Sequence, residues 1–398
     1  MSGNHEQQSI SARISFVDAL RGYALVGLFL VHMTGYFELY NARPEPSWVQ
    51  ETTRFLFQGK SFSLLALCFG FSFHVQLGGA KRRGEPFGLR FGWRMALLLA
   101  IGWAHALLYR GDILMVLAVS GLLLIPLDRI RSPRLLLGVA AALLLQPLLL
   151  VRIVAGHAGA DWAMAEPLFY DDGGALAPSL SGSFGALVQA NIRSGSVAKW
   201  SYFIETGRIL QVIGLFLVGM QLARSGVFAA PARFTRVLAG ALAVALVALA
   251  PLLLARAETC CHSTGPIYWT NILVSGWIDL AGTAIAFVLF AGLWALGSGR
   301  MLGVLAPAGR MTLTLYVGQS LVFVPVFYGF GLHLWDRITQ EQALLLGVMA
   351  AAAQIAGAHL WFRWFAYGPL EWLWRAGTRL SLDIPFLRAR EPLKRASS

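Results

Sequence analysis

Charged residues are scarce in this chain. Asp, Glu, Lys and Arg make up 13% of its 398 residues, whereas 57% are hydrophobic. A soluble protein of this size would carry about 25% charged residues, so the composition excludes an ordinary soluble globular class. The apolar residues fall into blocks of about twenty, the helix length that crosses about 30 Å of hydrocarbon. We therefore predict an all-α fold, a polytopic transmembrane helix bundle.

Cysteine is also rare. The chain has three: Cys68 in an apolar block, and the neighbours Cys260 and Cys261 in a predicted loop. Adjacent cysteines rarely bridge each other, so the sequence implies no disulfide framework. With His262 they supply too few ligands for a zinc site, and we predict no metal. A local structural role for the pair is favoured over redox chemistry.

Acidic residues are outnumbered, with 20 Asp and Glu against 32 Lys and Arg. The resulting net charge of +12 would suit a nucleic-acid partner if the basic residues formed one patch. Instead most of them lie in alternate loops between apolar blocks and near the two ends of the chain. Such a bias orients a membrane protein with its basic loops inside. We predict that both termini are cytoplasmic, and nucleic-acid binding is not needed to explain the charge.

Ten apolar blocks are predicted to span the bilayer, separated by Gly, Pro and charge clusters. They cover residues 17–39, 55–78, 93–109, 112–128, 134–155, 203–223, 235–256, 268–297, 311–332 and 343–365. The long, polar, Gly-rich connection at about 156–202 predicts a periplasmic loop. Residues 1–15 are predicted as a cytoplasmic tail before a retained first helix, with no cleaved signal peptide. The transmembrane domain then covers 16–380, and 381–398 form a basic cytoplasmic tail.

Three polar side chains interrupt the first apolar block: Asp18, Arg21 and His32. Charges at bilayer depth are costly and usually face a partner or a cavity. Asp18 precedes Arg21 by one helical turn, so the two can pair, and His32 falls within about 20° of the face of Arg21. An imidazole takes and returns protons near neutral pH, as a general base must. An alternative stays open: an ion pair at the helix end and a histidine bonded to a neighbouring helix.

A second cluster surrounds a tight hairpin in the segment GWAHALLYRGDILMV. It contains His105, Arg110 and Asp112, which the predicted orientation places toward the outer face. His105 is expected at the depth of His32, where two imidazoles and an arginine could hold a carbonyl or anionic group. Alternatively, Arg110 and Asp112 simply close the turn.

Two further charges lie in apolar blocks. Lys60, near the outer end of the second block, either extends its amine to the interface or takes part in a binding site. Asp279 would be costly in a helix without a partner, and Arg208 and Arg152 are its candidate partners.

The C-terminal stretch GRMTLTLYVGQSLVFVPVFYGFGL, followed by WFRWFAYGPLEWLWRAGT, resembles the signature of the YeiB-like bacterial inner-membrane family (domain of unknown function 418). The segments VDALRGYALVGLFLVHM, GKSFSLLALCFGFSF, AIGWAHALLYRGDILMVLAVSGLLL and GRILQVIGLFLVGMQLARSG resemble its other blocks in the same order. The resemblance extends from about 13 to 380 and implies a bacterial inner-membrane location. One departure is Leu315, where the family usually has Asn.

Through its first helix this family is similar to a wider group of transmembrane acyltransferases. The group includes bacterial sugar and peptidoglycan O-acyltransferases and the lysosomal heparan glucosaminide N-acetyltransferase. The hallmark of the O-acyltransferase branch is a basic residue, ten intervening residues and an essential histidine. Arg21 and His32 have this spacing, and Asp18 fits the preceding acidic position. YeiB-like members more often have Asn at the position of His32, so this chain carries the residue of the O-acyltransferases there.

The resemblance implies an integral-membrane acyltransferase that moves an acyl group from a cytoplasmic donor, such as acyl-CoA, to an envelope acceptor. His32 would be the general base, and Arg21, braced by Asp18, would lie nearer the donor. His105 and Arg110 would orient the acceptor or stabilise an oxyanion. The alternative is a transporter or flippase of a small metabolite or lipid-linked substrate that uses the same buried polar residues. The expected partners are the lipid bilayer, the donor and the acceptor; the acyl group, the acceptor and the oligomeric state are not predicted.

Overall fold

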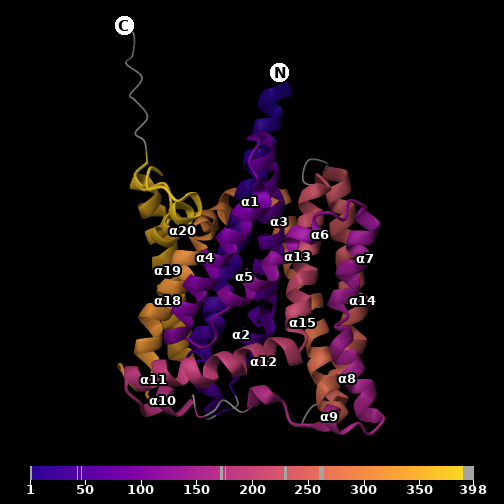
Figure 1. Cartoon of the computed structure of the whole chain (residues 1–398), viewed down its shortest axis with the longest axis vertical. Helices are drawn as coiled ribbons and strands as arrows, with labels where there is room; N and C mark the ends of the chain where they lie inside the picture. The colour runs from indigo at the N-terminus through magenta and orange to yellow at the C-terminus, as the bar shows by residue number, and fades with distance from the viewer. Residues whose placement is uncertain are drawn as a thin grey trace.

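A computed structural model describes residues 2–42, 44–45, 47–170, 174, 176–227, 231–259 and 264–388 (Figure 1). Within these ranges the chain is helical, without a strand, and Phe365 and Leu387 form an isolated β-bridge. The predicted all-α fold is therefore confirmed. Cys260, Cys261 and residues 389–398 of the predicted C-terminal tail lie outside the described residues.

The first half of the chain forms α1 (Ser2–Thr34), η1 (Leu39–Ala42), α2 (Trp48–Phe57), α3 (Lys60–Arg82), α4 (Phe87–Leu108), α5 (Leu114–Leu122), α6 (Leu124–Leu127), α7 (Pro133–Leu144), α8 (Pro147–His157), α9 (Asp161–Met164), η2 (Leu168–Tyr170), α10 (Leu176–Ser181), α11 (Phe184–Ala190), η3 (Asn191–Gly195) and α12 (Ser196–Glu205). The second half forms α13 (Arg208–Arg224), α14 (Pro231–Thr259), α15 (Gly265–Leu293), η5 (Trp294–Ser298), α16 (Gly299–Leu302), η6 (Gly303–Leu305), α17 (Ala306–Arg310), α18 (Thr312–Phe327), α19 (Gln340–Trp364) and α20 (Pro369–Arg379).

The described chain contains six segments that are helical, apolar and long enough to cross a membrane, or eight if each of two bent helix pairs counts as one span. The bent pairs are α7 with α8, at 42°, and the helical segment of α11 and α12 with α13, at 65°. Two other predicted blocks are shorter: 112–128 is divided between α5 and α6, and 311–332 contains the 16 residues of α18. The membrane-type helical fold is confirmed, whereas the count of ten spans and the cytoplasmic termini stay predictions.

Helices α3 and α13 pack closely, and two glycines face the partner backbone there. A Cβ on Gly70 would lie 1.9 Å from the carbonyl oxygen of Phe216, and one on Gly219 would lie 2.0 Å from that of Leu67. Small residues at such points let membrane helices approach closely. Helix α1 packs against α3, α17, α18 and α19, so its polar residues lie inside the bundle (Figure 1).

The beginning of α1 and helix α20 lie at one end of the bundle, and α9 to α12 lie at the opposite end (Figure 1). We call these the terminal end and the cover end. The connection predicted as a periplasmic loop contains short helices, and α12 runs across the bundle there. We call α10, α11, η3 and α12 the cover. The Asn191 side-chain amide donates to the Leu107 carbonyl (2.9 Å), and the Gly329 amide donates to the Ser179 carbonyl (2.9 Å), so the cover is tied to the helices beneath it.

Candidate active site

The turn after α1 has an unusual backbone. Tyr36, Phe37 and Glu38 follow one another with φ of 48°, 50° and 80°. Residues other than glycine rarely adopt this region, and such strain persists where the surrounding structure requires it. The Phe37 amide donates to the carbonyl of His32 (2.7 Å), and the Phe37 ring stacks on the imidazole with centroids 5.2 Å apart. The turn therefore folds back over His32 and brings Glu38 Oε1 within 3.4 Å of His32 Nδ1.

His32 is held through one ring nitrogen. The Tyr109 hydroxyl donates to Glu38 Oε1 (2.9 Å), and His32 Nδ1 lies 2.9 Å from the same hydroxyl oxygen. Because a phenol has a single proton, Nδ1–H of a neutral His32 donates to Tyr109. Nε2 then carries a lone pair, and this atom is buried without a hydrogen-bond partner in the structure. The network Glu38–Tyr109–His32 therefore fixes the tautomer.

His105 is held in the same way by a carboxylate. Its Nδ1 lies 2.9 Å from Asp112 Oδ1, and Asp112 Oδ2 accepts the Met115 amide (3.0 Å) at the start of α5. Both side chains are almost fully buried, and His105 Nε2 has no hydrogen-bond partner in the structure. A carboxylate on one imidazole nitrogen orients the ring and stabilises the imidazolium after the other nitrogen takes a proton. This is the arrangement of a general base.

The two histidines lie against the same tyrosine. The ring centroid of Tyr109 is 5.4 Å from that of His32 and 6.0 Å from that of His105. The structure therefore brings His32, His105 and Asp112 together, as their expected depth suggested. Arg110 lies next to them beneath the cover, since its Cβ would be 3.4 Å from a Cβ placed on Gly195.

The predicted pair in the first helix is confirmed, but it lies apart from the histidines. Arg21 Nη1 is 2.9 Å from Asp18 Oδ1, and the guanidinium also donates to the Ser72 hydroxyl of α3. A Cβ on Gly309 would be 1.7 Å from the Asp18 carbonyl oxygen, so α17 packs tightly at this point. Arg21 thus belongs to the terminal end of the bundle.

Lys60 belongs to a third group, centred on Asp279 of α15. Lys60 Nζ lies 2.9 Å from Asp279 Oδ1, and Arg208 Nη2 lies 2.6 Å from Oδ2. The predicted pairing of Asp279 with Arg208 is confirmed, whereas Arg152 pairs with Glu205 (3.0 Å). We call Lys60, Arg208 and Asp279 the charge hub. In the described part of the chain, Lys60 forms no hydrogen bond or ion pair with either histidine.

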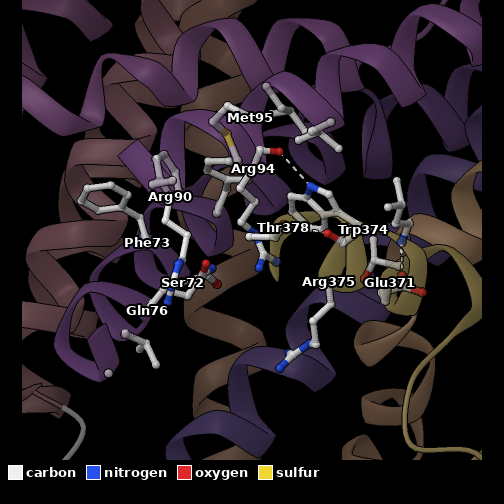
Figure 2. A pocket seen from close by; sticks show the side chains of 18 of the residues that line it. Ser72, Phe73, Gln76, Arg90, Arg94, Met95, Glu371, Trp374, Arg375 and Thr378 are labelled. Carbon is white, nitrogen blue, oxygen red and sulfur yellow. Dashed lines mark hydrogen bonds between the residues drawn. The ribbon is translucent and has the colours of Figure 1, made fainter. Parts of the chain in front are cut away.

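A cavity of about 640 Å³ enters the bundle between α1, α3, α4, α5, α18 and α20 (Figure 2). We call its cationic residues at the terminal end the arginine mouth, and its residues nearest the histidines the inner end. The arginine mouth comprises Arg82, Arg83, Arg90, Arg375 and Arg379. The inner end comprises Ile113, Leu114, Leu117 and Tyr316. Arg21, predicted to lie near a donor, also lines the cavity.

The electrostatics of the mouth are strongly positive. Glu85 is an acidic residue there, and its carboxylate lies 3.0 Å from Arg83 and 2.6 Å from Arg90. The hydrogen bond from Arg83 holds the pKa of Glu85 below its usual range, so this carboxylate is ionised at neutral pH. It offsets one positive charge of the arginine mouth, and the remaining arginines leave the mouth with a net positive charge.

Helix α20 forms one wall of the cavity. The Trp374 indole donates to the Arg94 carbonyl (2.8 Å), and the Arg94 guanidinium lies 3.8 Å from the Trp374 ring (Figure 2). Glu371 accepts the backbone amides of Leu313 (2.7 Å) and Thr314 (3.1 Å), so it caps the start of α18. Burial raises the pKa of Glu371. Two residues of the C-terminal segment WFRWFAYGPLEWLWR, Glu371 and Trp374, thus line the cavity.

The inner end of the cavity reaches the neighbourhood of His105. Tyr316 lines the cavity, and its ring centroid is 5.2 Å from that of His105. Neither histidine is among the lining residues. His32 is 8% exposed and lies between Phe37 and Tyr109, so its ring faces neighbouring side chains and not the cavity.

Sequence reasoning missed Glu38, Tyr109 and the cavity. Glu38 is a carboxylate at the end of an apolar block, and this signal was present in the sequence. The arginines of the mouth were noted, but as an orientation signal. Within the described ranges, no three His, Cys, Asp or Glu side chains group so as to hold a metal ion.

Two family models match this chain. Residues 222–381 match the family described as "Protein of unknown function (DUF418)", and residues 13–164 match "Heparan-alpha-glucosaminide N-acetyltransferase, catalytic". Protein YeiB of Escherichia coli strain K12 is 27% identical over 90% of this chain and 94% of its own length. The chain resembles the YeiB-like proteins along nearly all of its length. The resemblance predicted from the sequence is therefore confirmed.

Two further relatives are also similar to this chain over nearly its whole length. Protein YxaH of Bacillus subtilis strain 168 is 26% identical over 93% of this chain and 95% of its own length. A 39.9 kDa protein from the amylase 3′ region of Bacillus acidopullulyticus is 23% identical over 96% of this chain and 98% of its own length. These three relatives are described as uncharacterised. The acetyltransferase match covers Asp18, Arg21, His32, His105 and Asp112, so these residues lie in the region that is similar to that family.

Proposed function

We propose that this protein is an integral-membrane acyltransferase, which takes an acyl group from a cytoplasmic thioester such as acyl-CoA and passes it to an envelope acceptor. One observation carries the proposal: a cavity with a cationic mouth at the terminal end stops beside a buried carboxylate–histidine pair. The match to an N-acetyltransferase catalytic family over residues 13–164 supports the same reaction class.

The donor end of the proposal depends on charge. Phosphate groups of a coenzyme A thioester are anionic, and arginine guanidinium groups bind phosphate through charge-assisted, often bidentate hydrogen bonds. The arginine mouth supplies such groups, and the apolar inner end suits the pantetheine and acyl portions. Because basic loops face the cytoplasm, we infer that the mouth opens there, in the inner membrane of a bacterium.

The geometry supports His105 over His32 as the general base, although the family resemblance points to His32. His105 packs against Tyr316, which lines the inner end of the cavity, and Asp112 orients its ring. In the proposed step its Nε2 takes the proton of an acceptor hydroxyl or amine while that oxygen or nitrogen attacks the thioester carbonyl carbon. The carbon–sulfur bond breaks, and the thiolate leaving group receives the proton from the imidazolium. His32, across Tyr109, would position the acceptor.

The direct test supplies purified protein in lipid nanodiscs with [14C]acetyl-CoA and an extract of envelope glycans and lipids. Wild type should transfer label to an acceptor fraction. His105→Gln should lose about 10²–10⁴-fold of the rate, the usual contribution of a general base, and His32→Gln should lose less. Label that stays in the coenzyme A fraction with wild type would contradict the function. A greater loss in His32→Gln than in His105→Gln would reverse the assignment of the base.

A carrier is the second candidate function, and one observation favours it. The breaks of the two bent helix pairs meet, because the Gln146 side-chain amide donates to the Thr206 carbonyl (3.1 Å). Discontinuous helices often form the binding sites of transporters. However, the nearby Arg208 and Asp279 are already paired with each other. A carrier would move substrate across proteoliposomes without any acylated product, which the same labelled preparation distinguishes.

A further inference from the structure

Tyr316 of α18 is a polar group of the cavity to which no role has been given. It lines the inner end and is 4% exposed, and its ring lies 5.2 Å from the ring of His105. Its hydroxyl oxygen accepts the backbone amide of Ile113 (3.2 Å). The neighbouring Asp112 carboxylate is occupied by His105 and by the Met115 amide.

Within the described residues, the hydroxyl proton of Tyr316 therefore has no acceptor. A phenol donates one hydrogen bond and accepts others, and in its bond with the Ile113 amide Tyr316 is the acceptor. Buried polar hydrogens normally have an acceptor, so an unused one beside a cavity indicates a ligand atom that accepts it. The amide of Ile113 also polarises the hydroxyl and makes it a better donor.

We propose that Tyr316 is a catalytic residue that donates a hydrogen bond to the carbonyl oxygen of the bound thioester. Attack on the carbonyl carbon moves an electron pair onto this oxygen, and the hydroxyl stabilises the developing negative charge without losing its proton. The carbonyl then lies between Tyr316 and the proton-accepting Nε2 of His105. This role rests on the proposed function, since it requires a thioester in the cavity.

The backbone around Tyr316 keeps the hydroxyl in place. Glu371 caps the start of α18 through Leu313 and Thr314, one turn before Tyr316. Ile113, which donates to the hydroxyl, lies between Asp112 and the start of α5. The base and the proposed oxyanion donor are therefore fixed by the same hairpin. Preorganised donors of this kind act most strongly where water is excluded.

The kinetic test uses Tyr316→Phe, with Tyr268→Phe as the matched control. Tyr268 is also buried, at 5% exposed, but it packs against Trp269 in a separate apolar cluster. Tyr316→Phe should lower kcat by about 10²–10³-fold, the usual value of one oxyanion donor, and should raise KM for acetyl-CoA by no more than about tenfold. Tyr268→Phe should keep wild-type kcat. A loss shared equally by both variants, or confined to KM, would overturn the proposal.

A binding measurement tests the same hydrogen bond without catalysis. Two unreactive probes are compared: a ketone analogue of acetyl-CoA, which keeps the carbonyl, and S-ethyl-CoA, which lacks it. Wild type should bind the ketone about tenfold more tightly, about 1.4 kcal/mol, and Tyr316→Phe should abolish this preference. Equal binding of the two probes to wild type would overturn the role of Tyr316. Failure of acyl transfer with a preserved ketone preference would instead contradict the proposed function.

Discussion

Two buried carboxylates in this bundle, Asp279 and Asp112, have very different partners. Asp279 is held by two permanent cations, with Lys60 at 2.9 Å and Arg208 at 2.6 Å. Asp112 is held by a titratable imidazole, His105 at 2.9 Å, and by the Met115 amide at 3.0 Å. Burial and charge are thus common to both. They differ in one respect. The Asp112–His105 pair leaves His105 Nε2 oriented and without a partner near the cavity. In the charge hub, Lys60 and Arg208 are both paired with Asp279.

The surroundings of the two carboxylates also differ, because Asp279 is tightly packed and Asp112 lies near the cavity. Gly59, with φ of 74°, lies so close to the hub that a Cβ there would be 2.1 Å from Asp279 Oδ2. The hub thereby fixes the start of α3 against α13 and α15. Asp112 instead lies in a hairpin whose neighbour Ile113 lines the cavity. We infer that the charge hub stabilises the fold and that the Asp112 pair performs chemistry.

The largest expected effect is a loss of stability at the charge hub. Asp279→Asn removes the carboxylate from two buried cations, and breaking a buried pair in this way costs about 3–5 kcal/mol. We expect a matching fall in unfolding free energy in detergent, while the rate per folded molecule is kept. Glu85→Gln, which breaks an exposed ion pair, serves as the control and should change stability little. An unaltered unfolding curve for Asp279→Asn would contradict the structural role.

The second prediction applies the corresponding change to Asp112. Asp112→Asn keeps the size of the side chain but removes the charge that stabilises a His105 imidazolium. The rate of acyl transfer should fall by about 10⁴-fold, as expected when the orienting carboxylate of a base is lost. Glu38→Gln, in the Tyr109 network, should fall much less. If Glu38→Gln were the more severe variant, the chemistry would belong to His32.

Comparison of the sequence predictions with the structure explains why Asp112 was harder to interpret than Asp279. An acid alone in an apolar helix must find a basic partner, so energetic cost predicted a partner for Asp279, and Arg208 was one of two candidates. Asp112 had an adjacent arginine in a tight turn, and turn closure by Arg110 was an equally good reading. The bond from His105 crosses the hairpin, and its geometry depends on how α4 ends and α5 begins.

The all-α fold, the apolar blocks and the Asp18–Arg21 pair also followed from composition and helical spacing. The Glu38–Tyr109–His32 network did not, because three consecutive non-glycine residues with positive φ give no sequence signal. The cavity did not either, since its lining comes from helices scattered along the chain. Its arginines read in the sequence as an orientation signal, and only the fold gathers them around one cavity.

A third prediction concerns the arginine mouth. Arg90→Met should weaken binding of acetyl-CoA by about tenfold, because it removes a hydrogen bond to a charged phosphate. The difference from wild type should shrink at high ionic strength, where exposed charges are screened. Arg236→Met, an exposed arginine on α14 outside the cavity, is the matched control. Titration calorimetry measures both, and equal affinities for the two variants would remove the mouth from the donor site.

The smallest expected effect lies at the cover. Lys199 of α12 is buried, with its amine 3.1 Å from Met115 Sδ and 4.0 Å from Asp112 Oδ2. At 4.0 Å the ammonium supports the carboxylate without a hydrogen bond. Lys199→Met should therefore lower the transfer rate by about fivefold, equivalent to about 1 kcal/mol. Arg193→Met, on the exposed side of the cover, should have the wild-type transfer rate. An equal loss of rate in Arg193→Met would show that the effect comes from disturbing the cover and not from the contact of Lys199 with Asp112.

The proposed donor site is tested most directly by locating the acyl group of a bound coenzyme A thioester. Protein in nanodiscs is irradiated with a coenzyme A thioester whose acyl chain carries a diazirine, and the adducts are mapped by mass spectrometry. We expect adducts at Leu114, Leu117 or Tyr316, next to His105, which an excess of coenzyme A suppresses. Adducts confined to the lipid-facing helix α14 and insensitive to coenzyme A would contradict the proposed donor site.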